Sequence, residues 1–228
     1  AETIHLLRVE YKKLRSFLRM LSQANNTDEQ IKVSKSLKQY YNISGAIRDL
    51  QLQQLGIRET TKQEPKKPQA YLNLLQRELE KLKPELIEIF SEKSIAECKK
   101  KTDALLPEEF SIEEFRDFVK QKWAAVYAIL LSGQFGDDNI HTIRKILKDL
   151  FYNLKEYEGV EHEILSASTW KGKNEEYFET LLNELGSFQD QCTAIVLLKS
   201  YWLSSLNTYN RTLLEKIKKE WIKDKINM

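Results

Sequence analysis

The sequence predicts an all-α fold, and three observations support this prediction. Glycine and proline, which interrupt helices, number only 7 and 4 among 228 residues. Apolar residues recur at helical spacing along most of the chain, whereas no alternating strand pattern of useful length occurs. The composition, 41% hydrophobic and 31% charged, is typical of a soluble helical protein that is large enough to bury a core.

Capping residues and prolines divide this helical sequence into a series of expected helices. The segment NNTDEQ at 25–30 and Ser111 supply side chains that cap helix N-termini. A polar segment with two prolines at 58–69 is expected to be a linker, and SGQFGDDN at 132–139 a loop. Pro84 lies inside the third helix and is expected to kink or split it. The helices are expected over about 3–22, from 25–30 to 56, and over 70–101, 112–132, 139–157, 174–206 and 210–226.

Charge, cysteines and hydropathy exclude several classes of protein. The formal net charge of +2 is too small for a globally basic protein, so an anion site must come from a local arrangement of charges. Cys98 and Cys192 have no metal-ligand spacing and fit a reducing, cytoplasmic setting. The longest apolar run, 123–131, is about half of what a membrane-spanning helix needs, and no signal peptide is visible. Neither a membrane role nor a metal or other cofactor is expected.

A stripe of positive charge marks the first helix. At about 100° per residue it lies beside the apolar stripe, not opposite to it, and it contains no acid. An ordinary solvated helix face mixes acids with bases, because mixed pairs attract and like charges repel. The stripe therefore indicates an anionic partner, with a solvated face as the alternative interpretation. Its members are His5, Arg8, Lys12, Arg15 and Arg19, and those of the apolar stripe are Ile4, Leu7, Tyr11, Leu14 and Leu18.

The same pattern recurs at 140–157. Two of the chain's three histidines occupy the matched position, which chance explains poorly. Only Arg15 loses its charge, because Phe151 stands at the corresponding place. The second stripe contains His141, Arg144, Lys148 and Lys155, which match His5, Arg8, Lys12 and Arg19, and Lys145 follows Arg144.

A second motif follows each stripe, since GAIRD at 45–49 resembles GSFQD at 186–190. Both glycines fall inside expected helices, where glycine costs about 1 kcal/mol relative to alanine, so a close approach between helices is expected at each. The chain is thus predicted to be a single domain, 1–228, of two repeats over about 3–132 and 137–228 whose basic stripes share a groove. A helix precedes the second stripe but not the first, so we expect either an N-terminal truncation or an incomplete variant of the repeat.

Four sequence elements, taken in order, resemble those of the CHAD family, the conserved histidine α-helical domain. The first has the form H-x-x-R-V-x-x-[RK]-[RK]-L-R, the second is an R-D pair, the third is H-x-x-R-K-x-x-K followed by a tyrosine, and the fourth is L-G-x-x-Q-D. Each element alone is a weak signal, but the ordered set covers most of the chain. The matching residues are His5, Arg8, Val9, Lys12, Lys13, Leu14 and Arg15; Arg48 and Asp49; His141, Arg144, Lys145, Lys148 and Tyr152; and Leu185, Gly186, Gln189 and Asp190.

The resemblance implies two pseudo-symmetric helical bundles around a basic central channel, which binds inorganic polyphosphate without catalysis. It also implies an association with polyphosphate granules in the cytoplasm. Asp149 and Phe151 depart from the family pattern and are expected to weaken the second stripe. The implied polyphosphate ligands are His5, Arg8, Lys12, Arg15, Arg19, Arg48, His141, Arg144, Lys145, Lys148 and Lys155.

The spacing of the cations favours a chain-like anion. Side chains at i, i+3, i+7, i+10 and i+14 lie about 4.5–6 Å apart along a helix, which suits a linear polyanion better than one isolated phosphate. RNA binding and a histidine phosphotransfer function remain alternatives, as does a structural role for His5 and His141. For Asp49 and Asp190 a structural role is expected. A hydrolase is disfavoured, because the sequence has no carboxylate cluster for Mg²⁺, no glycine-rich phosphate loop and no nucleophile motif.

Overall fold

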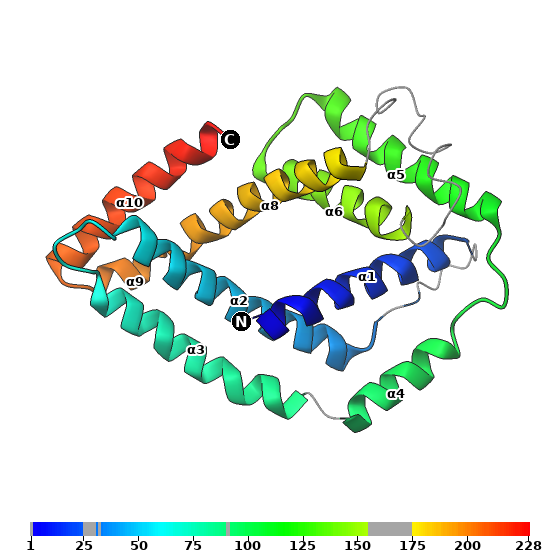
Figure 1. Cartoon of the computed structure of the whole chain (residues 1–228), viewed down its shortest axis with the longest axis horizontal. Coiled ribbons are helices and arrows are strands. Elements are labelled where there is room, and N and C mark those ends of the chain that lie inside the picture. Colours follow the sequence, from blue (N-terminus) through cyan, green and yellow to red (C-terminus); the bar gives the residue numbers. More distant parts are fainter. Residues whose placement is uncertain (1, 25–30, 32, 90–91, 155–174) are drawn as a thin grey trace. The chain divides into compact units, whose positions relative to one another are not determined.

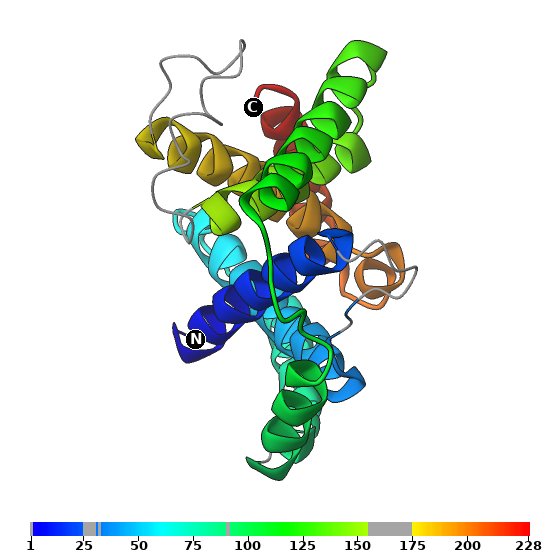
Figure 2. The same cartoon turned by 90° about the vertical axis from the view of Figure 1, so that its right-hand side faces the viewer.

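The computed structural model describes residues 2–24, 31, 33–89, 92–154 and 175–228, and all regular secondary structure in these ranges is helical (Figures 1 and 2). This confirms the all-α class. Within these ranges, no helix is both long enough and apolar enough to span a bilayer. The helices are α1 (Glu2–Ala24), α2 (Lys35–Thr60), α3 (Gln69–Ile89), α4 (Glu92–Asp103), α5 (Ile112–Ser132), α6 (Asp137–Leu154), α8 (Glu175–Leu197), α9 (Ser200–Ser204) and α10 (Thr208–Ile226).

The chain divides into two compact units, each with its own hydrophobic core. Unit 1 comprises residues 1–8, 38–94 and 187–228, and unit 2 comprises 9–37 and 95–186. The boundaries fall inside α1, α2, α4 and α8, so each of these helices contributes residues to both units. The arrangement as one domain of two repeats around a basic channel stays a prediction.

Unit 2 is built around α5 and α6, which lie side by side in both views (Figures 1 and 2). The expected cap at Ser111 is confirmed: its hydroxyl accepts the Glu114 N–H at 3.2 Å, and the Glu114 carboxylate accepts the Ser111 N–H at 2.7 Å. The bond from the Ser111 backbone lowers the pKa of Glu114. Gly133 ends α5 with φ of 65°, a left-handed conformation that favours glycine. The core contains Leu18, Met20, Leu21, Ile31, Phe115, Phe118, Val119, Trp123, Val126, Leu147, Leu150, Leu154, Phe178 and Leu182.

In unit 1, helices α2 and α3 pack with α9 and α10. The helix that was expected over 174–206 is interrupted in this unit. In place of one helix, α8 stops at Leu197 and α9 begins at Ser200, because Lys199 has an extended backbone. The carbonyl of Leu197 accepts from Tyr71 Oη, and the carbonyl of Leu198 accepts from Lys218 Nζ, both at 3.0 Å. These two donors satisfy carbonyls that a continuing helix would have satisfied. The core contains Ile43, Ile47, Leu50, Ile57, Tyr71, Leu72, Leu75, Leu79, Leu198, Leu203, Leu213, Leu214, Ile217 and Trp221.

The proline within the expected helix over 70–101 does not split it. Helix α3 continues through Pro84 to Ile89, and α4 begins at Glu92. Pro84 cannot donate to the carbonyl of Glu80, yet both residues are exposed, so water can hydrate that carbonyl. The expected N-cap at 25–30 and most of the connection at 158–173 lie outside the described residues.

Candidate functional site

The predicted ligands are divided between the two units. His5 is exposed in unit 1, where Arg8 and Arg48 are partly buried. In unit 2, Lys145 is exposed and the other members are partly buried. Lys155 lies outside the described residues. The members in unit 2 are Lys12, Arg15 and Arg19 on α1, and His141, Arg144, Lys145 and Lys148 on α6.

Within unit 2, buried hydrogen bonds hold α1 directly against α6. Ser16 Oγ donates to the carbonyl oxygen of Asp149 at 3.1 Å. Asn153 Nδ2 donates to Ser16 Oγ at 2.9 Å and to the same Asp149 carbonyl at 2.8 Å. All three residues are buried, with exposed fractions of 0%, 7% and 2% for Ser16, Asp149 and Asn153. The two helices that carry the matched basic motifs are therefore neighbours in this unit.

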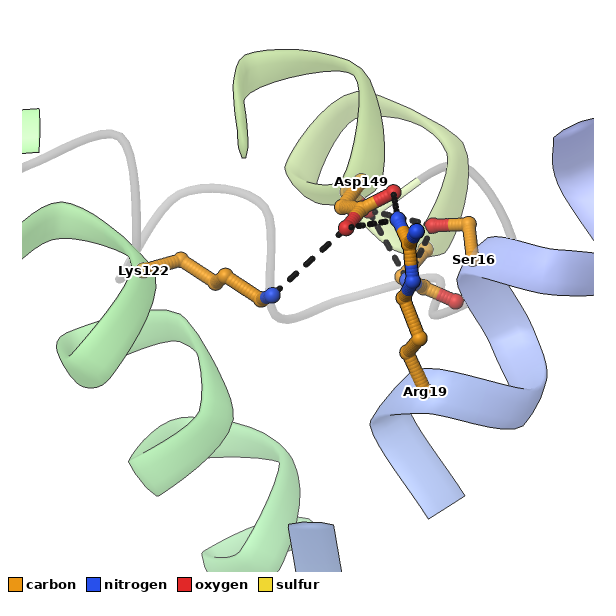
Figure 3. A network of polar contacts seen from close by, with 5 residues as sticks. Ser16, Arg19, Lys122 and Asp149 are labelled. Carbon is orange, nitrogen blue, oxygen red and sulfur yellow. Dashed lines mark hydrogen bonds and ion pairs between the residues drawn. The ribbon is translucent and has the colours of Figure 1, made fainter. Parts of the chain in front are cut away.

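Asp149 gathers cations from two other helices (Figure 3). Its carboxylate oxygens lie 3.0 and 3.2 Å from Arg19 Nη1 of α1, and one of them lies 3.5 Å from Lys122 Nζ of α5. Two cations around one carboxylate leave the cluster with a net positive charge. The side chains of Arg19 and Lys122 are 40% and 21% exposed, so both cations remain accessible from solvent.

Other cations of unit 2 lie against aromatic rings. Lys148 Nζ donates to Tyr152 Oη at 3.2 Å and lies 5.5 Å from the centre of that ring. The Arg15 guanidinium lies 5.9 Å from the centre of the Tyr11 ring, and Lys122 Nζ lies 5.1 Å from that of Phe118. In these contacts the charged group itself lies near the ring, where the negative face of the ring attracts it.

The arginines of the two matched motifs each lie against the glycine of the following motif. A Cβ atom added to Gly45 would come within 2.6 Å of Arg8 Nη1, and one added to Gly186 within 3.2 Å of Arg144 Nη2. The close approach expected at each glycine is therefore an approach by an arginine side chain. Both contacts are internal to one unit, Arg8 with Gly45 in unit 1 and Arg144 with Gly186 in unit 2.

Arg8 is further fixed by α2. Its Nη1 donates to the carbonyl of Tyr41 and, at 3.3 Å, to Ser44 Oγ, while its guanidinium lies 4.3 Å from the centre of the Tyr41 ring. Burial raises the pKa of the Tyr40 phenol, and the charge of Arg8 offsets part of that rise. Arg8 is thus held by the protein itself through two hydrogen bonds and a ring contact.

Sequence reasoning missed Lys122, the cation that α5 adds to the site. Lys122 has no counterpart in the matched motifs, and it precedes the buried Trp123. The available signal was its position four residues after buried Phe118, which places a lysine at the edge of the apolar face of a helix. No group of three or more His, Cys, Asp or Glu side chains that could hold a metal ion occurs among the described residues.

Comparison with known families and proteins gives one match. A sequence model of the CHAD domain matches residues 1–199 of the 228-residue chain. Searches of curated proteins and of solved structures gave no significant match. Because the matched range covers well over half of the residues and contains all four motifs, the chain belongs to the CHAD domain family.

Proposed function

We propose that this protein binds inorganic polyphosphate, without catalysis, through the basic residues of unit 2. The observation that carries the proposal is the contact between α1 and α6, which places Asp149 of α6 beside Arg19 of α1 and Lys122 of α5. Both helices carry further cations along their basic stripes. Membership of the CHAD family supports the same function. A cytoplasmic location with association to polyphosphate granules belongs to the proposal.

Polyphosphate suits such a site because it offers charge and hydrogen-bond acceptors but no apolar surface. Arginine presents a planar fork of donors to phosphate oxygens, and lysine acts as a mobile point charge. Several cations along one helix can contact successive phosphates of a linear chain. Binding releases counterions, so the affinity is expected to fall steeply as salt concentration rises.

The direct test is a calorimetric titration of long-chain polyphosphate at two salt concentrations. We expect salt-sensitive binding by the wild-type chain and an affinity roughly tenfold or more lower for a Lys12→Gln/Arg15→Gln variant. The variant should remain folded by circular dichroism, because both side chains are only partly buried. Equal affinity of the wild type and the folded variant would contradict the proposal.

Asp149 provides a test of opposite sign. Its carboxylate neutralises part of the charge of Arg19 and Lys122, so Asp149→Asn should raise the affinity for polyphosphate severalfold. The matched control is Asp117→Asn on α5, which removes one exposed carboxylate that is paired with Lys120 at 3.2 Å. A similar gain in both variants would indicate a general effect of net charge and would count against a site around Asp149.

Two further experiments on the same purified protein distinguish polyphosphate binding from the two alternative functions. An RNA oligonucleotide that binds as tightly as polyphosphate and displaces it would assign a general polyanion site. Phosphate transfer to His5 or His141 from a phosphorylated donor protein would assign a phosphotransfer function instead. We expect neither result, because phosphate chains need only the charge and donors that the cluster around Asp149 provides.

A further inference from the structure

A pocket of about 470 Å³ opens between α2, α8 and α10 in unit 1, and the proposed polyphosphate site makes no use of it. Three carboxylates line the pocket, Asp49 and Glu59 from α2 and Asp190 from α8. No lysine, arginine or histidine is among its lining residues. The charged residues that line the pocket are therefore all acidic, which favours a cation over a phosphate.

Asp49 and Asp190 are the acids that end the two related motifs GAIRD and GSFQD. They lie far apart in the sequence, yet both line this one pocket. The internal similarity of the sequence thus supplies one acid from each copy to a common site. The sequence predicted only a structural role for these two aspartates.

A buried acceptor in the pocket lining gives independent evidence for a ligand with hydrogen-bond donors. Gln53 is only 1% exposed, and its Nε2 donates to Tyr71 Oη at 3.1 Å. Tyr71 Oη uses its own proton to donate to the carbonyl of Leu197, so it can only accept from Gln53, and this fixes the orientation of the amide. Gln53 Oε1 is then a buried acceptor without a hydrogen-bond partner among the described residues. A buried acceptor of this kind favours a donor that enters the pocket.

The remaining lining suits an alkyl chain. Leu52, Leu55 and Ala194 contribute apolar side chains, and the buried Trp221 contributes an aromatic ring. Gly56 faces this ring, since a Cβ at that position would lie 3.7 Å from the Trp221 side chain. Aromatic faces attract ammonium groups as well as methylene groups.

The described residues do not favour a metal ion in this pocket. A closed metal site built from protein side chains has three or more ligands that converge on one point, and no such group of His, Cys, Asp or Glu is present in the described ranges. The three carboxylates therefore line the pocket as separated charges. An elongated organic cation matches this arrangement better than a compact ion.

We propose that this pocket binds an aliphatic amine cation, whose ammonium groups pair with Asp49, Glu59 and Asp190 and donate to Gln53 Oε1 while its methylene chain packs against Leu52 and Trp221. A diamine or polyamine of a few methylene groups fits the volume and the distribution of charge. The inference concerns a different unit and the opposite charge from the polyphosphate site, so either proposal can fail while the other holds.

The test is a calorimetric titration of the full chain with 1,4-diaminobutane, in the absence of polyphosphate. The neutral analogue 1,4-butanediol, which has the same number of carbon atoms, serves as the ligand control. We expect binding of the diamine only, and an affinity lowered roughly tenfold or more by Asp49→Asn/Asp190→Asn. The matched protein control is Asp117→Asn, an exposed carboxylate of unit 2, which should leave the affinity unchanged.

A Gln53→Met variant tests the buried acceptor separately, since it keeps the approximate shape of the side chain. We expect this variant to bind the diamine severalfold more weakly. If the variant does not fold, the Asp49→Asn/Asp190→Asn variant alone tests the inference, because neither aspartate is buried and the variant should fold. Absence of diamine binding by the folded wild type, equal binding of the butanediol, or unchanged affinity of the aspartate variant would overturn the inference. Tight Mg²⁺ binding that the aspartate variant loses would also overturn it and assign a metal site.

Discussion

The Arg8–Gly45 contact in unit 1 is tighter than the Arg144–Gly186 contact in unit 2, although the sequence matches the two arginines and the two glycines. A Cβ at Gly45 would lie 2.6 Å from the arginine, against 3.2 Å at Gly186. Arg8 Nη1 gives both of its protons to acceptors on α2. In contrast, Arg144 Nε is buried and has no hydrogen-bond partner among the described residues.

The difference teaches that one motif position can serve two purposes. When a donor that already bonds within the protein turns toward a ligand, its former acceptors lose a hydrogen bond. This loss costs free energy and weakens the binding of the ligand. Arg8 therefore acts first as a structural residue that joins α1 to α2. Arg144 keeps donor capacity, and we expect it to contribute more to anion binding.

Loss of Arg8 should have the largest effect on stability. Arg8→Met removes two charge-assisted hydrogen bonds and the contact with the Tyr41 ring, and it should lower the free energy of unfolding by about 2 kcal/mol. Urea denaturation measures this change. The control is Lys13→Met on the same helix, where an exposed pair with Glu10 should contribute less than about 0.5 kcal/mol. Equal effects of the two variants would show that Arg8 is not a structural anchor.

Loss of Arg144 should have the next largest effect, and on binding more than on stability. Arg144→Gln is expected to lower polyphosphate affinity roughly tenfold, which corresponds to about 1.4 kcal/mol, and to reduce the dependence of affinity on salt. Calorimetry at two salt concentrations measures both quantities. If folded Arg8→Met loses more affinity than Arg144→Gln, then Arg8 is the stronger anion ligand and the contrast between the two arginines is reversed.

Substitution of Gly45 tests the tighter contact directly. Alanine gains about 1 kcal/mol of helix propensity, but its methyl group would displace a guanidinium that two hydrogen bonds hold in place. We expect Gly45→Ala to lower the free energy of unfolding by about 1 kcal/mol. In an Arg8→Met background the same substitution should become neutral or stabilising, because the obstructing group is gone.

Substitution of Gly186 should give the smallest effect, with the opposite sign. A methyl group there needs Arg144 to move by only a few tenths of an ångström. The gain in helix propensity should then prevail, and we expect Gly186→Ala to raise the free energy of unfolding by about 0.5 kcal/mol. Thermal unfolding of the two alanine variants side by side measures the contrast; a shift of the same sign and size in both would remove the distinction between the contacts.

Local signals in the sequence predicted the all-α class and several local features of the fold. Ser111 and Glu114 form their cap from residues three positions apart. Both helical glycines lie at close contacts, although the contact is with an arginine side chain and not the expected approach of one helix to another. The break between α8 and α9 could not be predicted locally, because its carbonyls are satisfied by Tyr71 and Lys218 from other helices. Contacts with residues of other helices therefore determine where α8 ends.

The distinction between local sequence signals and contacts between helices also applies to the residues of the candidate site. Helical spacing assigned Arg15 and Arg19 to the basic stripe and Leu14 to the apolar stripe, but this leucine is 39% exposed. Asp149 was expected only to weaken the second stripe; its position between Arg19 and Lys122 depends on how three helices pack. The convergence of Asp49 and Asp190 on one pocket likewise required the structure.

Neither compact unit is a continuous stretch of the chain, and this restricts how the protein can be cut. Unit 1 is assembled from three segments and unit 2 from two, so no proteolytic nick can release either of them as a separate fragment. A gene fragment that encodes only 3–132 would lack residues 187–228, and with them six members of the unit 1 core, Leu198, Leu203, Leu213, Leu214, Ile217 and Trp221. Such a fragment would therefore need residues 187–228 of a second molecule to complete this core, as in a swapped dimer.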